Sequence, residues 1–240
     1  MPDSLLNDRQ RRVQEHTTNG TVFFDRAATA AALAAYPLPA YFLDFETIQF
    51  AVPIWKGTRP YQQIPFQFSL HILDGSGALA EIPFLDLSGD DPSEAFAHAL
   101  IAACGREGPV FVYNAGFETA RIRELGERFP QLRDDLLAIN DRVVDLLPLA
   151  REHYYHPSQE GSWSIKKVLP AGCPELRYDA LDGVQDGGMA MEAFLEGIHP
   201  DTREQRKAEI ERQLLAYCGL DTYAMVRLWQ EFSGRTDLKL

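Results

Sequence analysis

YFLDFETIQF, residues 41–50, has the pattern of a β-strand in which two acidic residues interrupt aromatic and aliphatic ones. Side chains alternate between the two faces of a strand, so Asp44 and Glu46 are expected on one face, together with Phe42. Two neighbouring carboxylates raise each other's pKa and destabilise the fold unless something positive lies between them. The stretch therefore predicts a strand that carries a candidate cation site on one face.

The composition indicates a soluble globular protein. The chain has 240 residues, 45% of them hydrophobic, and its 35 acidic and 23 basic residues give a formal net charge of −12. This length fits one domain with additions better than two full domains. The acidic balance argues against tight, sequence-independent binding to duplex nucleic acid, but it allows an enzyme that acts on short or single-stranded ends.

Cysteine use and hydropathy favour the cytoplasm. The cysteines at positions 104, 173 and 218 are scattered, which fits neither a disulfide framework nor a zinc-ligand pattern and indicates a reducing compartment. The most apolar run, residues 27–43, contains two prolines and predicts a short helix, a break and a strand rather than a membrane span. The charged N-terminus lacks the apolar segment of a signal peptide, so we expect no membrane partner.

The segments before and after residue 37 differ in character. Residues 1–36 are polar and then Ala-rich without a clear strand signal, which predicts a leader or a connector, and the domain is expected to span residues 37–240. Within it, residues 41–87 have the pattern of three antiparallel strands joined by turns, with DGSG at 74–77 as the second turn. Apolar and polar residues alternate over 64–73, which predicts a half-buried strand.

Helices and strands are expected to alternate in the rest of the chain. Residues 90–108 predict a helix, and the apolar stretch 109–114 predicts a strand parallel to the first one. A helix is expected over 117–129, a strand that runs into a helix over 142–155, and a long helix over 202–232. The sequence therefore predicts an α/β fold, in which an antiparallel meander of three strands and further parallel strands form a mixed sheet flanked by helices.

Two further segments bring acidic residues to the expected site. In VFVYNAGFE, residues 110–118, a buried strand ends near Asn114 and Glu118 begins a helix, at the sheet edge where ligand sites gather. In the long C-terminal helix, Tyr217 and Asp221 are four residues apart and therefore share one face.

These motifs carry a family resemblance. DFET at 44–47, NAGFE at 114–118 and YCGLD at 217–221 resemble, in order and spacing, the motifs of the DEDD exonuclease superfamily, and more specifically its tyrosine subtype. The chain is thus similar to DnaQ-like, ribonuclease-H-fold nucleases from residue 41 to about residue 232. It is also similar to an uncharacterised bacterial domain-of-unknown-function family, in which the domain often follows a Cas4-like nuclease region, so that this chain would be a C-terminal piece or a short member.

The resemblance implies a 3′–5′ exonuclease that hydrolyses DNA or RNA ends with two Mg²⁺ or Mn²⁺ ions, for which oxygen ligands are suited. It implies that Asp44 bridges both ions, that Glu46 and Asp221 complete one metal site, and that Glu118 serves the other. Glu118 departs from the superfamily, which usually has aspartate there; its charge is the same and its reach is longer. Tyr217 is expected to orient the attacking water, because a phenol with a pKa near 10 is a poor base at neutral pH.

Four weaker assignments follow from the same resemblance. Thr47 and Ile48 are expected to touch the hydroxyl and the base of the terminal nucleotide, and Asn114 to fix the loop before Glu118. Either Lys166 or Lys167, in SWSIKKVL, is expected to hold a phosphate.

Plainer interpretations apply to other polar residues. His153 and His156 lack a third ligand at a suitable spacing, which favours a surface helix end over a zinc site. Asp145 is expected to have a structural role, with a functional place in the cleft as the less favoured alternative. The charged run 201–213 is expected to be a solvated helix face.

Two other functions fit the sequence. One is a catalytically silent domain that binds nucleic-acid ends or a partner protein, which Glu118 and the acidic net charge would explain. The other is a phosphodiesterase for dinucleotides or other small phosphoesters, which would leave long oligomers intact.

Overall fold

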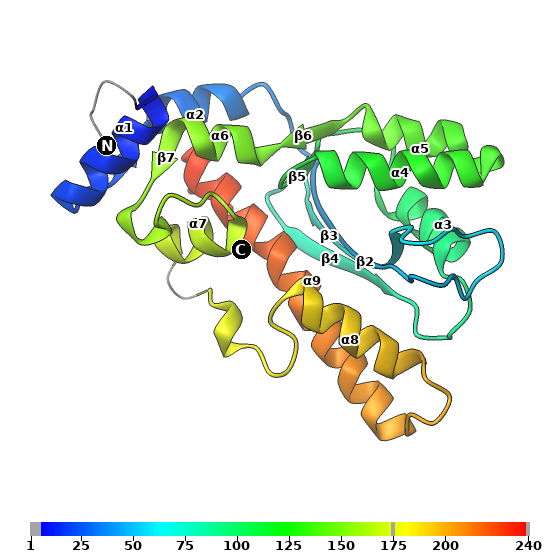
Figure 1. The fold of residues 1–240 in the computed structure, drawn as a ribbon. Coiled ribbons are helices and arrows are strands. Elements are labelled where there is room, and N and C mark those ends of the chain that lie inside the picture. Colours follow the sequence, from blue (N-terminus) through cyan, green and yellow to red (C-terminus); the bar gives the residue numbers. More distant parts are fainter. Residues whose placement is uncertain (1–5, 174–175, 239–240) are drawn as a thin grey trace.

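The computed structural model, which describes residues 6–173 and 176–238, is an α/β fold built on a mixed five-stranded sheet (Figure 1). The strand order is β4-β3-β2-β5-β6. The strands are β2 (Ala40–Ile48), β3 (Ile64–Leu73), β4 (Leu79–Leu85), β5 (Val110–Val112) and β6 (Val143–Asp145).

The pairing of the strands confirms the predicted meander. β2 pairs antiparallel with β3, and β3 pairs antiparallel with β4. β5 lies parallel to β2, and β6 lies parallel to β5. The β2–β3 register shifts between Glu46 and Thr47, so a β-bulge follows directly after the second acidic residue of the opening strand.

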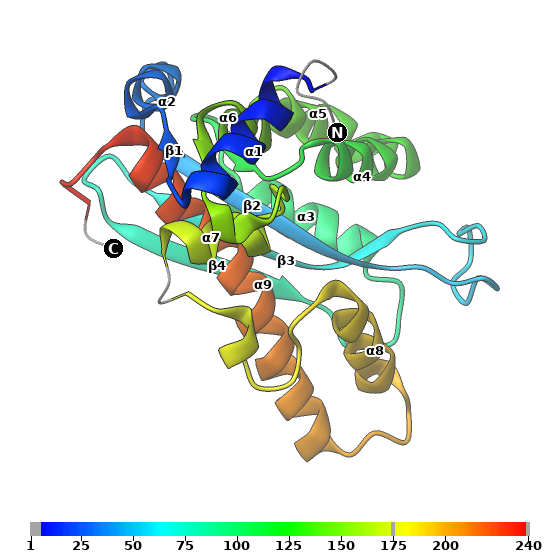
Figure 2. The same cartoon turned by 60° about the vertical axis from the view of Figure 1, so that its left-hand side comes forward.

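Helices cover both faces of the sheet (Figure 2). On one face, Leu43 and Phe45 belong to a core shared with α3 (Ser93–Ala103), α4 (Gly116–Arg128) and α5 (Arg133–Asn140). On the other face, Phe42 packs against Trp229 of α9 (Glu204–Ser233), and this core extends to α6 (Leu146–His153) and α7 (Ile165–Gly172). The predicted alternation of side chains along the opening strand is therefore confirmed.

The prediction of a half-buried β3 was wrong, because α9 covers its polar face. Gln67, Ser69 and His71 are all buried. The Gln67 side-chain amide donates to the Leu214 carbonyl at 2.7 Å, and the Ser69 hydroxyl and His71 Nδ1 each lie 2.8 Å from the Thr222 hydroxyl. Buried polar groups need such partners, and here the partners also fix the position of α9 along the strand.

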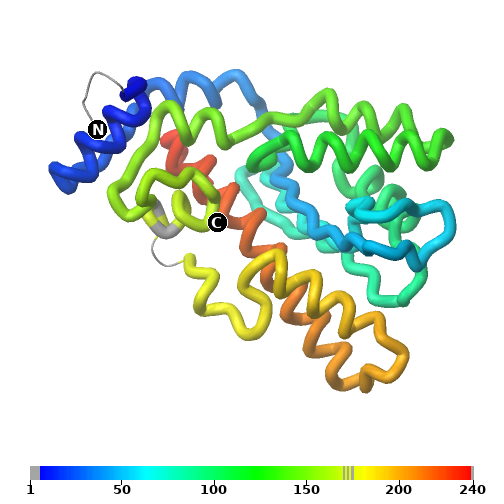
Figure 3. The backbone as a smooth tube through the Cα atoms, in the orientation of Figure 1, coloured from blue at the N-terminus to red at the C-terminus, as the bar shows by residue number. Residues whose placement is uncertain are grey.

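The N-terminal segment forms three elements: α1 (Asp8–Asn19), β1 (Phe23–Phe24) and α2 (Arg26–Leu33). No strand was predicted in this segment, but β1 pairs antiparallel with β7 (Tyr154–Tyr155). The Arg12 guanidinium donates to the carbonyls of Arg151 and Glu152 at the end of α6. α1 contacts β7, and Figure 3 shows α2 beside α6 and the end of α9, so both helices pack against the rest of the fold.

Other short elements were not predicted from the sequence. They are α5, α7 and α8 (Gly187–Ile198), together with the 3₁₀ helices η2 (Pro130–Leu132), η3 (Pro157–Gln159) and η4 (Tyr178–Ala180). α8 and the first half of α9 lie side by side at one end of the molecule (Figure 1). Among the described residues, no helix is both long enough and apolar enough to cross a membrane.

Candidate functional site

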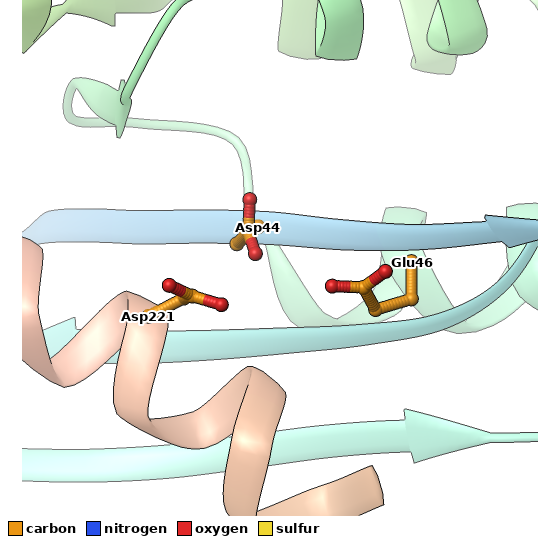
Figure 4. Close-up of side chains that lie close together, drawn as sticks. All are labelled: Asp44, Glu46 and Asp221. Carbon is orange, nitrogen blue, oxygen red and sulfur yellow. The ribbon is translucent and has the colours of Figure 1, made fainter. Parts of the chain in front are cut away.

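Three of the predicted carboxylates meet in space. Asp44, Glu46 and Asp221 each offer a carboxylate oxygen, and these oxygens all lie within 4.8 Å of one another. Figure 4 shows the two side chains of β2 and that of α9 directed toward a shared space. We call these three residues the acidic triad; it is also the only group of three or more metal-ligating side chains found in the described part of the chain.

Packing of α9 across the sheet places Asp221 opposite β2. One contact is the Phe42–Trp229 ring pair, with centroids 6.0 Å apart, and another is the buried Thr222 hydroxyl, which lies between Ser69 and His71. Because Thr222 follows Asp221 directly, the hydrogen bonds to β3 hold the helix turn that carries the third carboxylate. The triad is therefore positioned by the core, not by a mobile loop.

Burial keeps the triad from ionising fully without a cation. Burial, followed by the charges of Asp221 and Glu46, raises the pKa of Asp44 well above its ordinary value. Burial also raises the pKa of Glu46 to about 8 and that of Asp221 to about 6. Two charges at this separation repel by about 3 kcal/mol at an effective dielectric constant of about 20. A cation would relieve both effects.

Lys166 contributes one positive charge to the site. Its ammonium donates to the Tyr217 hydroxyl at 2.8 Å and to the Gln185 carbonyl at 3.2 Å. Its charge lowers the pKa of both Glu46 and Asp221, against the larger effect of burial. Of the two lysines considered from the sequence, Lys166 is thus the one at the site, because Lys167 pairs with Glu160 at the surface.

Two tyrosines, Tyr217 and Tyr178, lie next to Asp221. Tyr217 is buried, and burial together with the charges of Asp221 and Glu46 raises its pKa above the ordinary value, so it is an even poorer base than expected. The Tyr178 hydroxyl donates to Asp221 Oδ1 at 2.6 Å. Tyr178 was not predicted as a site residue, because it lies in a short 3₁₀ helix without a recognisable motif.

Asp186 is a further acidic neighbour that was not predicted. It caps α8, accepting from the Met189 amide at 2.9 Å, and its charge adds to the raised pKa of Glu46. An Asp-Gly-Gly sequence before an apolar helix is a recognisable cap signal, so the sequence did contain a clue to its structural role.

Glu118 lies near the triad but outside the group of oxygens that define it. It occupies the first turn of α4 and is 2% exposed, and its Oε2 has no hydrogen-bond partner among the described residues. Burial raises its pKa to about 8, and its charge in turn contributes to the raised pKa of Asp44. The predicted fourth carboxylate is therefore within electrostatic reach of the triad.

The loop before Glu118 is held by Asp145, as the structural interpretation of that residue predicts. Asp145 Oδ1 accepts from the amides of Asn114 and Leu147, both at 2.9 Å, and Oδ2 accepts from the Ala115 amide at 3.0 Å. Asn114 adopts a left-handed conformation with φ of 78°, which asparagine tolerates better than most residues. Asp145 and Asn114 together shape the turn between β5 and α4.

The two candidates that follow Glu46 differ in exposure. Thr47 is partly exposed just past the β-bulge, whereas Ile48 is 2% exposed in a core cluster with Trp55. The contacts of Thr47 and Ile48 with a terminal nucleotide stay predictions. His156 accepts from the Ser158 amide at 3.1 Å and caps η3, while His153 ends α6. These positions fit the predicted surface role of the two histidines.

Residues 41–164 match the protein family described as Domain of unknown function (DUF2779). The chain belongs to this family. The match confirms the resemblance to a domain of unknown function noted from the sequence. It includes Asp44, Glu46 and Glu118 and ends before Tyr217 and Asp221, which the fold brings to the same site.

One similar protein is the "Uncharacterized protein MG366 homolog" of Mycoplasma pneumoniae (strain ATCC 29342 / M129 / Subtype 1). The two are 27% identical over 206 residues, which cover 78% of this chain and 31% of the relative. The chain thus spans about a third of the length of that relative. No solved structure matches the chain.

Proposed function

We propose that this domain is a metal-dependent phosphodiesterase, and specifically a 3′–5′ exonuclease of the DEDD superfamily, tyrosine subtype, acting on DNA or RNA ends. The observation that carries the proposal is the acidic triad, whose oxygens lie within 4.8 Å of one another although its residues come from opposite ends of the sequence. A lone D-x-E motif is weak evidence, whereas the third carboxylate from α9 makes it a candidate site.

The fold supports the same proposal. A ribonuclease-H-like sheet, as the family resemblance implies it, has an antiparallel meander followed by parallel strands, and the order β4-β3-β2-β5-β6 fits that description. The acidic residues also occupy compatible places, on β2, at the start of α4 and on α9.

The donor set fits Mg²⁺ or Mn²⁺. All of the candidate ligands are carboxylate oxygens, which these hard cations prefer, and no sulfur or imidazole ligand is part of the triad. Asp44, Glu46 and Asp221 would hold the first ion, and Asp44 with Glu118 the second. Such ions, when bound, make water more acidic and neutralise charge on a phosphate.

The surrounding side chains would position rather than transfer protons. Tyr178 orients Asp221 by its hydrogen bond to Oδ1. Lys166 holds the Tyr217 hydroxyl and brings a positive charge next to Glu46 and Asp221, where a substrate phosphate would enter. Because the pKa of Tyr217 is raised, its hydroxyl keeps its proton and can donate it in a hydrogen bond, either to Asp221, whose pKa this bond lowers, or to water or phosphate.

Digestion of 5′-labelled DNA and RNA oligomers with Mn²⁺, Mg²⁺ or EDTA tests the proposal. We expect a ladder of products that shorten by single nucleotides, formed with Mn²⁺ or Mg²⁺ and absent with EDTA. Intact oligomers under every condition, from protein that still binds Mn²⁺, would contradict it.

The water-orienting role of Tyr217 is tested by its replacement with phenylalanine. The ring remains and the hydroxyl is lost, so we expect kcat to fall by about 10- to 100-fold, a hydrogen-bond-sized effect on the transition state. Single-turnover kinetics would separate this change from effects on binding. Full activity in the variant would show that the hydroxyl has no role in the reaction.

Tyr178→Phe is expected to weaken Mn²⁺ binding by about tenfold, because Asp221 loses the partner that orients it. Calorimetric titration of the metal-free protein with Mn²⁺ measures this affinity. Tyr61→Phe is the matched control, since Tyr61 is 68% exposed, and it should bind Mn²⁺ like the parent protein. Equal Mn²⁺ affinities for the parent protein and both variants would show that the Tyr178 hydroxyl does not contribute to metal binding.

One observation favours a second function. Glu118 is not part of the triad, so a second ion would be held by fewer ligands than the first. A domain with one well-formed metal site could bind nucleic-acid ends without hydrolysing them or cleave only small phosphoesters. The length of the products separates these functions: an exonuclease shortens long oligomers, a small-substrate enzyme cleaves only dinucleotides, and a silent domain cleaves neither.

A further inference from the structure

A second site candidate is a groove between α1, the end of β5, α6 and the start of α7. Its volume is about 740 Å³. Asn114 and Ile165 form part of its lining; the first belongs to the turn before Glu118, and the second directly precedes Lys166. The groove therefore shares the β5–α4 turn and helix α7 with two residues near the triad, Glu118 and Lys166. We call it the arginine groove, after Arg9 and Arg151, which also line it.

The charge of the arginine groove is opposite to that of the protein. The whole chain carries a formal net charge of −12, yet the residues that line this groove include two arginines and no aspartate or glutamate. Both arginines are exposed, and neither appears in an ion pair within the described part of the chain. In a protein with this acidic balance, a groove without acidic residues is suited to an anionic ligand.

The groove is built from fixed parts. The Tyr113 hydroxyl donates to the Trp163 carbonyl at 2.6 Å, and the Trp163 indole donates to the Tyr154 carbonyl at 2.8 Å, which ties the floor of the groove to β7. Arg12, one turn after Arg9 on α1, holds that helix against the end of α6. Arg9 is thereby kept over the Trp163 ring, with its guanidinium carbon 5.8 Å from the ring centroid.

We propose that the arginine groove binds the sugar-phosphate backbone of a single-stranded nucleic acid whose 3′ end lies at the acidic triad. Arginine pairs well with phosphate, and the groove shares the β5–α4 turn and α7 with the site where the terminal phosphodiester would be cleaved. Two arginines can neutralise only a few phosphates, which suits a single strand better than the many phosphate contacts of a duplex binder. The inference rests on the proposed function, because the triad sets where the strand ends.

The groove also assigns a role to the N-terminal helix. α1 supplies Arg9 and, through Arg12, its attachment to α6. On this proposal, residues that the sequence indicated as a leader form one wall of the path along which the strand enters. The part of the domain that lies outside the matched segment 41–164 would then help to select the substrate.

Binding of a fluorescent single-stranded oligomer to the full chain, measured by anisotropy, tests this proposal separately from catalysis. The measurement uses an Asp44→Asn background, in which the strand should not be hydrolysed. Arg9→Ala with Arg151→Ala is compared with a control pair, Arg11→Ala with Arg106→Ala, whose arginines form exposed ion pairs and do not line the groove. Arg9→Lys with Arg151→Lys tests whether charge alone restores binding.

The groove variant is expected to bind at least about tenfold more weakly than the control pair. The slope of the logarithm of affinity against the logarithm of salt concentration should fall in magnitude by roughly 0.7 for each arginine removed. The lysine pair should regain most of the affinity. Equal binding by the groove and control variants would overturn the proposal, and so would tighter binding to a duplex than to the single strand.

The outcomes for the groove and for the proposed function can be told apart. If Asp44-containing protein degrades oligomers but the groove variant binds and degrades them like the control, the groove proposal fails and the exonuclease stands. If the oligomer binds through Arg9 and Arg151 but is never degraded, the groove proposal stands and the exonuclease fails.

Discussion

Replacement of Asp44 by asparagine is expected to reduce Mn²⁺-dependent hydrolysis of oligomers by on the order of 10³-fold or more, because it removes the carboxylate assigned to both metal ions. The same change is expected to raise the thermal stability of the metal-free protein. If Asp44 is a metal ligand, the variant should lose hydrolytic activity and gain thermal stability. If Asp44 has only a structural role, the variant should lose stability.

The gain in stability follows from the environment of Asp44. Burial and three neighbouring acids, Asp221, Glu46 and Glu118, raise its pKa well above the ordinary value, so its charged form destabilises the fold. Asparagine has nearly the same shape and no charge. Removing the charge also relieves Glu46 and Asp221, whose oxygens lie within 4.8 Å of those of Asp44.

Thermal unfolding in EDTA at pH 8, together with the digestion assay, checks both halves of the prediction. Asp90→Asn is a suitable control, because Asp90 is exposed in the loop before α3, and it should change neither activity nor melting temperature appreciably. An Asp44→Asn protein that is inactive but also less stable would indicate a structural role for the carboxylate and would contradict the cation site.

The part of this site that could be predicted from the sequence is the part that local patterns determine. Alternation along β2 places Asp44 and Glu46 on one face, and helical spacing places Tyr217 and Asp221 together. The order of strands and helices then indicates that β2 and β5 are parallel neighbours, which the structure confirms.

The remainder depends on contacts that no local pattern determines. The polar residues of β3 alternate as in a solvent-facing strand, and only the packing of α9 turns Gln67 and Ser69 into buried residues. Tyr178 reaches Asp221 from a short 3₁₀ helix that has no periodicity to recognise. β1 has two residues, too few for any pattern, and exists because β7 pairs with it.

Glu118 illustrates the same limit within a recognised motif. Its sequence position predicts a carboxylate at the end of β5, and the structure places it there, on the first turn of α4. Its distance from the other three depends on how α4 packs against the sheet and on the extra methylene of glutamate. The motif therefore predicts that Glu118 lies near the other carboxylates, whereas its distance from them depends on the packing of α4.

The stability of the metal-free protein is expected to fall as the pH rises from 6.5 to 8. The pKa values of Glu46 and Glu118 are raised from the ordinary 4.5 to about 8, and that of Asp44 is raised well above 3.8. In this window the folded protein therefore holds protons that the unfolded chain has already released. Stability must then decrease as the pH rises, by up to about 1.4 kcal/mol per pH unit for each proton held.

Other groups contribute little in this window. Burial lowers the pKa of His71 from 6.5, so its contribution has the opposite sign, and it fades through the lower half of this window as the unfolded chain loses the same proton. Burial raises the pKa of Cys104 from 9.0 to about 12, and its contribution begins only above the window. The slope in the upper half of this window, up to pH 8, therefore reports on the carboxylates with raised pKa values. A loss of about 2 kcal/mol would lower the melting temperature by roughly 4 to 8 °C in a domain of this size.

Saturating Mn²⁺ is expected to cancel this slope, because the ion stabilises the ionised carboxylates and releases their protons. The difference in melting temperature between Mn²⁺ and EDTA should therefore grow from pH 6.5 to pH 8. Glu46→Gln should make the slope in EDTA shallower and shrink the Mn²⁺ effect, whereas Glu211→Gln, an exposed change on α9, should alter neither. A melting temperature in EDTA that stays constant or rises over this range would mean that the triad is ionised without a metal, and the site would then have no need of a cation.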